Sequence, residues 1–192
     1  FIWEFPMHNE GVAEGVFDEK DGFIYASDKD SYFYKVDAKT GKAQWEIKTD
    51  CPVSNVYHRS EENIIYLFDN KSSVYGIDKA KGTLLWKYTA ENPFTSQNFM
   101  SGDVIYTFDS NSITALAKNK GEKIWKLDMK NPSPVDKNIT DTLYAVSEDL
   151  LQAIDITGGK IKWNYRASGQ IKKILPVKDI FYILSENSVS AV

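Results

Sequence analysis

Residues 36–45 read Val-Asp-Ala-Lys-Thr-Gly-Lys-Ala-Gln-Trp, and versions of this stretch return three more times along the chain. Each version places a glycine four residues before a tryptophan: the glycines are Gly41, Gly82, Gly121 and Gly159, and the tryptophans are Trp45, Trp86, Trp125 and Trp163. Together with Trp3 these are all five tryptophans, and the intervals between them are 42, 41, 39 and 38 residues. A period of about 40 residues is typical of propellers and solenoids.

Residues 52–88 show what one repeat contains. Four short runs rich in Ile, Leu, Val, Tyr and Trp, at 53–57, 63–68, 73–77 and 83–88, are separated by residues typical of turns. This pattern predicts a four-stranded antiparallel meander, because β-branched and aromatic residues favour strands and Asp, Asn and Gly favour turns. The constant spacing from glycine to tryptophan predicts that each tryptophan packs against a neighbouring sheet, so Trp3 and the four glycines and tryptophans above are expected to be docking residues.

The stretch at 36–45 resembles the tryptophan-docking motif of PQQ-like β-propeller repeats, written A-x-D-x-x-T-G-K-x-x-W. Residues 77–86, 116–125 and 154–163 follow the motif less closely. Its leading alanine is present as Ala115 and Ala153 but is replaced by Lys35 and Gly76 in the first two copies. The resemblance covers essentially the whole chain, and it is closer to the outer-membrane-assembly propellers than to the complete quinoprotein dehydrogenases.

The repeats predict an all-β fold, a single PQQ-like repeat β-propeller over residues 1–192 with four-stranded antiparallel blades. The expected blades are about 6–47, 52–88, 93–127, 132–165, and 171–192 plus 1–5. By phase, residues 1–5 correspond to an outermost strand and residues 171–192 to the first three strands of a blade, so we expect the N-terminal strand to complete the fifth sheet. The alternative is a five-sheet arc of a larger, seven- or eight-bladed propeller, which is the habit of the family.

Composition narrows the range of partners. The chain has 192 residues, a formal net charge of −4 and a pI near 5.3, so nucleic acid is not expected to bind. No apolar run approaches the ~20 residues of a membrane-spanning helix. A single cysteine, Cys51, excludes an intrachain disulfide. The chain begins inside a repeat, which suggests a preceding segment and is compatible with a membrane-anchored parent or complex.

Acidic residues fall at related positions of the repeats. We expect Asp28, Asp69, Asp109, Asp149 and Glu186 in loops that join second and third strands, on one face of the fold. Aspartate in such loops usually forms the turn itself, which is the favoured interpretation. The alternative is a face that binds a cation or a cationic partner, and the sequence leaves metal binding open.

Four residues break the repeat and are candidates for partner binding: His58, Arg59, Phe94 and Phe99. An arginine near aromatic side chains is typical of interface hot spots, although the same composition also fits a packed interior. No catalytic residue is predicted. The two histidines are not accompanied by a glycine-flanked nucleophile of the kind that a serine-histidine-acid triad needs.

These observations predict a non-catalytic β-propeller scaffold that needs no cofactor and binds a protein or peptide partner in the periplasm or outside the cell. The alternative is a five-bladed propeller enzyme, either a hydrolase or metal-dependent, with carboxylates at a central funnel. The resemblance also raises a PQQ-dependent dehydrogenase. Such enzymes are much larger and carry a vicinal cysteine pair, which a chain with one cysteine lacks.

Overall fold

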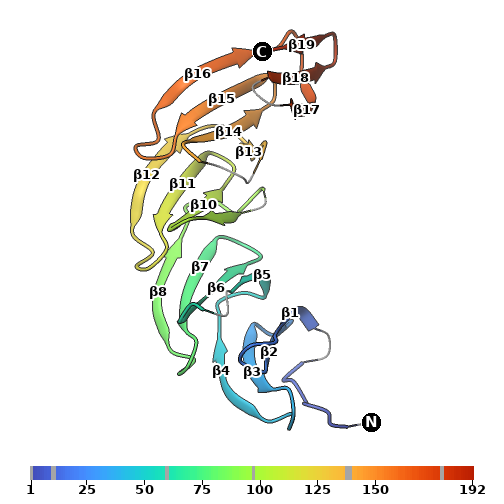
Figure 1. Cartoon of the computed structure of the whole chain (residues 1–192), viewed down its shortest axis with the longest axis vertical. Helices are drawn as coiled ribbons and strands as arrows, with labels where there is room; N and C mark the ends of the chain where they lie inside the picture. Colours follow the sequence, from blue (N-terminus) through green and yellow to red (C-terminus); the bar gives the residue numbers. More distant parts are fainter. Residues whose placement is uncertain (1, 10–11, 59–60, 97, 137–139, 178–179) are drawn as a thin grey trace. The chain divides into compact units, whose positions relative to one another are not determined.

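The computed structural model describes residues 2–9, 12–58, 61–96, 98–136, 140–177 and 180–192. In this part of the chain the secondary structure consists of 19 β-strands in five antiparallel sheets. Figure 1 labels these strands. The prediction of an all-β fold of five repeated sheets is therefore confirmed. The described residues contain no helix long and apolar enough to span a lipid bilayer.

The chain divides into two compact units. The first comprises Phe1–Glu91 and Asn119–Gly121, and the second comprises Asn92–Lys118 and Glu122–Val192. In each four-stranded sheet the strands lie in chain order or its reverse, as a meander requires.

The first unit contains two four-stranded sheets. Their strands are β1 (Val12–Asp18), β2 (Phe23–Asp28), β3 (Tyr32–Asp37) and β4 (Ala43–Lys48), followed by β5 (Val53–Tyr57), β6 (Ile64–Asp69), β7 (Ser73–Asp78) and β8 (Leu84–Thr89). The first strands of the two sheets, β1 and β5, contact each other. The buried core lies on the second and third strands, with Tyr25, Phe33, Ile65 and Ile77 fully shielded from solvent.

The second unit contains three sheets. The first has β9 (Phe99–Ser101), β10 (Val104–Phe108), β11 (Ser112–Ala117) and β12 (Lys123–Asp128). The second has β13 (Ser133–Pro134), β14 (Thr142–Ser147), β15 (Leu150–Asp155) and β16 (Ile161–Arg166). The third has only β17 (Ile171–Val177), β18 (Ile180–Ser185) and β19 (Val189–Ala191).

One register irregularity recurs in all four-stranded sheets. Between the third and fourth strands the pairing shifts directly after the residue that faces the tryptophan; the facing pairs are Lys35 with Trp45, Gly76 with Trp86, Ala115 with Trp125 and Ala153 with Trp163. One extra residue before each tryptophan therefore forms a β-bulge, which bends the strand and re-aims the ring. A small residue opposite the ring, as in three of the four pairs, leaves it room to lie over the sheet.

Four of the five tryptophans lie against the glycine of the repeat that follows them in the chain. Gly41, Gly82, Gly121 and Gly159 have φ between +67° and +70°, and a Cβ on them would lie 2.3–2.7 Å from Trp3, Trp45, Trp86 and Trp125 respectively. Three of these indoles also donate an Nε1 hydrogen bond to a carbonyl of the same turn, on Ala38, Lys79 and Ile156. The glycine thus supplies both a left-handed turn and a surface without a side chain.

Trp86 departs from this pattern. Its Nε1 has no hydrogen-bond partner among the described residues. The indole instead lies close over Gly76, where a Cβ would come within 2.4 Å of Nε1. Glycine at position 76, in place of the motif alanine, accommodates this ring position.

The predicted pairing of residues 1–5 with residues 171–192 is not seen in the structure. The fifth sheet has three strands, and residues 2–7 are not in a strand, while Phe1 lies outside the described residues. Residues 3–8 are held on the first sheet instead. Trp3 lies on Gly41, the Phe5 ring packs edge-on against Tyr34 at 5.3 Å, and the His8 amide donates to the Tyr34 hydroxyl at 3.2 Å.

The glycine contact can be tested by comparing Gly82→Ala with Gly22→Ala. Both glycines lie in the first unit with φ of +69° and +74°, but nothing lies within 4 Å of a Cβ at Gly22. The left-handed conformation should cost each variant roughly 1–2 kcal/mol. Gly82→Ala should lose about 1–3 kcal/mol more, because the new methyl group overlaps the Trp45 ring.

Urea unfolding followed by tryptophan fluorescence measures both losses. Equal destabilisation of the two variants would show that the turn conformation alone requires glycine, and that the contact with the ring contributes nothing.

Candidate functional site

The repeated aspartates form turns. Asp28, Asp69 and Asp109 are at most 3% exposed, and each accepts hydrogen bonds from backbone amides of the loop that follows it. The hydroxyls of Tyr34 and Tyr75 also donate to Asp28 and Asp69, at 2.6 and 3.1 Å. Burial by itself raises the pKa of Asp28, but the bonds from Tyr34 and the backbone outweigh it and keep this pKa below its ordinary value. These three carboxylates are thus engaged in turn geometry, as the favoured interpretation expects.

The remaining two acidic candidates lie at the surface in ion pairs. Asp149 accepts from Arg166, and Glu186 lies 2.9 Å from the Lys172 ammonium. Among the described residues there is no group of three or more His, Cys, Asp and Glu side chains with the arrangement of a metal site.

His58 belongs to a buried ionic cluster that the sequence did not predict. Its Nε2 lies 2.6 Å from Asp18 Oδ2, and the Lys79 ammonium lies 2.8 Å from the same oxygen and 3.0 Å from Asp21. The side chains of Asp18 and His58 are 0% and 8% exposed, and the His58 ring packs on Tyr25 at 5.3 Å. The cluster joins the end of β1 to residues after β5 and β7, so it fastens the first two sheets of the first unit together.

The charges of this cluster shift the pKa values of its members. Burial opposes the charge of Lys79, but hydrogen bonds to Asp18 and Asp21 outweigh it and raise the pKa above its ordinary value. Lys35 lies nearby, with its ammonium 4.1 Å from the Phe23 ring centroid and 3.2 Å from the Lys79 carbonyl oxygen. Burial lowers the pKa of Lys35. Burial and the hydrogen bond to Asp21 both raise the pKa of Tyr25, so its phenol stays protonated and donates.

The other candidates for partner binding differ in position. Phe99 is 2% exposed and stacks on Tyr106 and Phe108 in the core of the second unit, which matches the alternative of a packed interior. Phe94 is half-buried and forms an isolated backbone bridge with Asp109. Arg59 lies outside the described residues.

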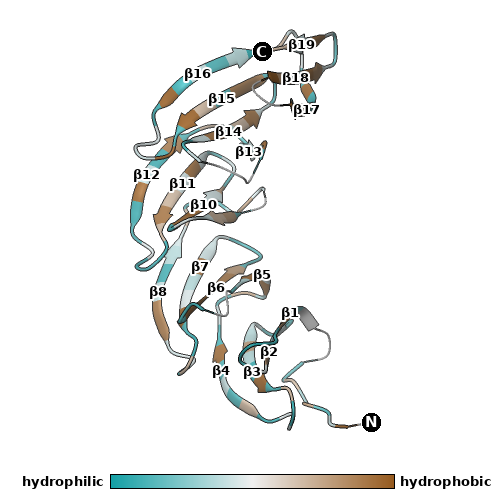
Figure 2. Ribbon diagram, viewed as in Figure 1, coloured by the Kyte–Doolittle hydropathy of each residue, from teal (hydrophilic) through white to brown (hydrophobic). Residues whose placement is uncertain are grey.

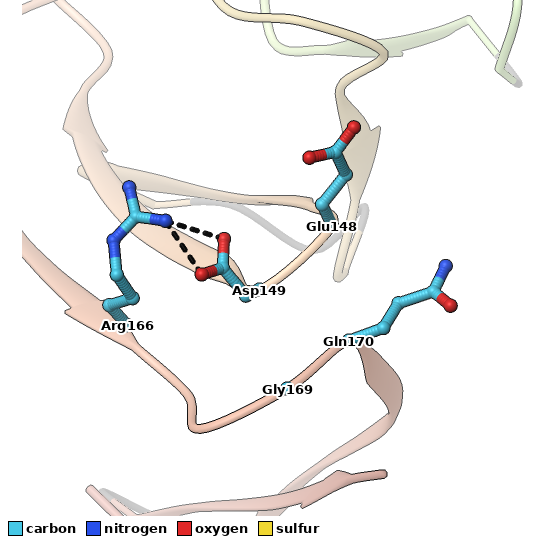
Figure 3. Close-up of a pocket in the computed structure, with 5 residues that line it drawn as sticks. All are labelled: Glu148, Asp149, Arg166, Gly169 and Gln170. Atoms are coloured by element: carbon cyan, nitrogen blue, oxygen red, sulfur yellow. Dashed lines mark hydrogen bonds and ion pairs between the residues drawn. The ribbon is translucent and has the colours of Figure 1, made fainter.

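An open pocket of about 500 Å³ lies in the second unit, lined by Glu148, Asp149, Arg166, Gly169 and Gln170. Figure 3 shows the Arg166 guanidinium facing the Asp149 carboxylate, while Glu148 and Gln170 project from the two loops of the rim. Arg166 Nη1 donates to both oxygens of Asp149, at 2.7 and 2.6 Å, although the arginine side chain is 65% exposed. The remaining guanidinium nitrogens therefore stay available at the surface.

The shape of the β14–β15 turn creates one wall of this pocket. Only Glu148 and Asp149 join these strands, whereas three residues separate β2 from β3 and β6 from β7. Glu148 has φ of +51°, a left-handed conformation that costs a non-glycine residue energy. The sequence signal for this turn was the spacing from Tyr144 to Trp163, which is 19 residues, as in the third repeat, and one residue shorter than in the first two repeats.

The repeated sheets and the tryptophan contacts define a β-propeller protein of the PQQ-like repeat class. The chain belongs to the family described as outer membrane protein assembly factor BamB, whose model matches residues 2–133 and, in a second overlapping match, residues 109–192. A comparison with curated protein sequences finds no match.

Solved structures share the fold. The crystal structure of the computationally designed Ika8 protein aligns with a TM-score of 0.59 over 99% of this chain and 73% of its own, at 10% identity. The computationally designed Ika4 protein aligns with a TM-score of 0.55 over 100% of this chain and 96% of its own, also at 10% identity. At this identity the likeness concerns the fold alone.

The buried cluster predicts unequal effects of removing two lysines. Lys79→Met should destabilise the protein by about 3–5 kcal/mol, because it takes the ammonium away from the buried Asp18 carboxylate. Lys130→Met removes the partner of Glu148 from a pair whose side chains are 71% and 59% exposed, and should cost less than about 1 kcal/mol. Urea unfolding measures both, and similar losses would contradict the assigned role of Lys79.

Proposed function

We propose that this chain is a non-catalytic propeller platform that binds a protein or peptide partner outside the cytoplasm. The description of its family, an outer membrane protein assembly factor, supports both the compartment and a protein as partner. The observation that carries the proposal within the molecule is the open, charged pocket around Arg166.

The pocket has the properties of a protein-binding surface. Arg166 is one of only two arginines in the sequence, and arginine is enriched at interface hot spots because its planar fork binds carboxylates and carbonyls. Asp149 fixes the orientation of the guanidinium, which lowers the entropy lost when a partner binds.

Two exposed ion pairs involve residues that line the pocket or neighbour its lining. Lys130 pairs with Glu148 at 3.0 Å and Lys172 pairs with Glu186 at 2.9 Å, so the rim offers both signs of charge. Such a rim favours a polar polypeptide carrying both acidic and basic side chains, because complementary charges raise the rate of association and select the partner.

The proposal is tested by placing a photo-crosslinking amino acid at Gln170, in the pocket, and at Lys29 as a control. Lys29 is exposed in the β2–β3 turn, the position in the first repeat that corresponds to the pocket wall in the fourth. Irradiation in an envelope or secreted extract should link one defined protein through position 170 and not through position 29.

Arg166→Ala, combined with the crosslinker at position 170, should lower the yield more than about tenfold, as expected for loss of a hot-spot arginine. Arg166 is exposed, so the variant should unfold at the same urea concentration as the parent. Identical products from positions 170 and 29, or an unchanged yield in Arg166→Ala, would contradict this site.

A further inference from the structure

In the second and third sheets, a pair of aromatic rings packs between the first two strands. Tyr57 of β5 packs edge-on against Phe68 of β6, with ring centroids 5.3 Å apart. Phe99 of β9 stacks on Phe108 of β10 at 5.9 Å. Phe68 and Phe108 are at most 1% exposed, so these rings fill space that solvent does not enter.

Valines stand at the corresponding positions of the fourth sheet. Val146 lies two residues after the tyrosine that recurs in every repeat, here Tyr144, as each of the two buried phenylalanines does in its own repeat. The Val135 amide donates to the Tyr144 carbonyl oxygen at 2.9 Å, so Val135 stands opposite this tyrosine, as the first ring of each pair does in its own sheet. Both valines are half-buried. Two smaller side chains thus replace a packed pair of rings.

These valines line a cleft of about 180 Å³ between the fourth and fifth sheets, within the second unit. Its apolar wall consists of Pro134, Val135, Val146, Ile171 and Ile174. The two isoleucines belong to β17, and its partner strand β18 is mostly hydrophobic, as Figure 2 shows. Sites for whole small molecules usually have about 300–1,000 Å³, so the cleft suits a single apolar side chain better.

Two lysines also line this cleft, and they differ in their partners. The Lys172 ammonium lies 2.9 Å from the Glu186 carboxylate and donates to the Gln170 side-chain oxygen at 2.6 Å. Lys173 is exposed, and in the part of the chain that the structure describes its side chain has no hydrogen-bond or ion-pair partner. The Lys173 ammonium therefore remains available to a carboxylate from outside the chain.

We propose that this cleft binds an apolar side chain of a polypeptide, phenylalanine or leucine, whose neighbouring aspartate or glutamate pairs with Lys173. The incoming side chain takes up space of the kind that the paired rings fill in the second and third sheets. An anchor residue that fills a pocket carries much of the binding energy of a peptide, and the ion pair selects the acidic neighbour.

This site goes beyond the proposed function, because no residue that lines the Arg166 pocket lines the cleft. Crosslinking through position 170 tests the pocket with a partner from an extract. A short peptide added to the pure protein tests the cleft, so either site can fail without the other.

The test follows the methyl groups of the cleft by NMR. Protein with isotope-labelled isoleucine and valine methyl groups is titrated with the blocked peptide acetyl-Gly-Phe-Glu-Gly-amide to about 10 mM, since one anchor and one exposed ion pair give weak binding. The ring current of the peptide phenylalanine should shift the Val146 and Ile174 signals. The Ile65 signal, from the core of the first unit, should not move.

Two matched peptides separate the anchor from the charge. Glutamine in place of the peptide glutamate should weaken binding about threefold to fivefold, as expected for loss of an exposed ion pair. Alanine in place of the peptide phenylalanine should abolish the shifts. Lys173→Gln should remove the difference between the glutamate and glutamine peptides. Lys160→Gln should preserve it, because Lys160 is also exposed but does not line the cleft.

Val146→Phe tests the shape of the cleft. It introduces the residue that the second and third repeats carry at this position, and the added ring should fill the cleft and lower the affinity for the phenylalanine-glutamate peptide more than about tenfold. The comparison of peptides needs no change in the protein, so the proposal stays testable even where this variant is less stable.

Absence of shifts at the cleft methyl groups would overturn the proposal, and so would shifts of equal size with all three peptides. Absent shifts together with self-association of Lys173→Gln would assign the lysine another role, since charged side chains on an edge strand such as β17 prevent its pairing with other chains.

Discussion

The fold depends on one contact, the face of a tryptophan from one repeat lying on a glycine in the turn of the next. The glycine satisfies two requirements at once. Its positive φ closes the turn between the third and fourth strands, and its missing side chain lets the indole approach the backbone. In each four-stranded sheet a β-bulge before the tryptophan bends the strand and changes the direction of the ring. Sheets that are each too small to bury both faces thereby acquire a neighbour.

Much of the fold was predictable from the sequence, because the same packing contact in every repeat requires the same residues at a constant interval. The period of the tryptophans and the strand pattern of residues 52–88 predicted five sheets and an all-β fold, which the structure confirms. The motif did not reveal that Trp45 contacts Gly82 rather than Gly41, four residues before it. A constant spacing within a motif indicates that both residues are needed. It does not indicate whether the two residues contact each other or residues of neighbouring repeats.

The sites were less predictable, since they depend on residues that do not repeat. His58 was recognised as an exception, yet its partner Asp18 is 40 residues away and resembles any other turn aspartate in the sequence. Arg166 was not recognised because it ends an ordinary fourth strand. Its partner Asp149 lies in a two-residue turn that is shorter than the corresponding turns of the first two repeats. In the sequence this difference appears only as a Tyr144-to-Trp163 spacing of 19 residues, one fewer than in the first two repeats.

The arrangement of the docking contact also bears on how such a chain can change in length. Each of the first three copies of the motif carries both halves of an interface, a glycine that receives the preceding tryptophan and a tryptophan that lies on the following glycine. Duplication or loss of one whole repeat in the gene therefore joins two halves that already fit. Insertion of part of a repeat would separate them. The number of sheets can thus change in single steps, and no new interface has to evolve each time. This property belongs to the motif and not to any one of its copies.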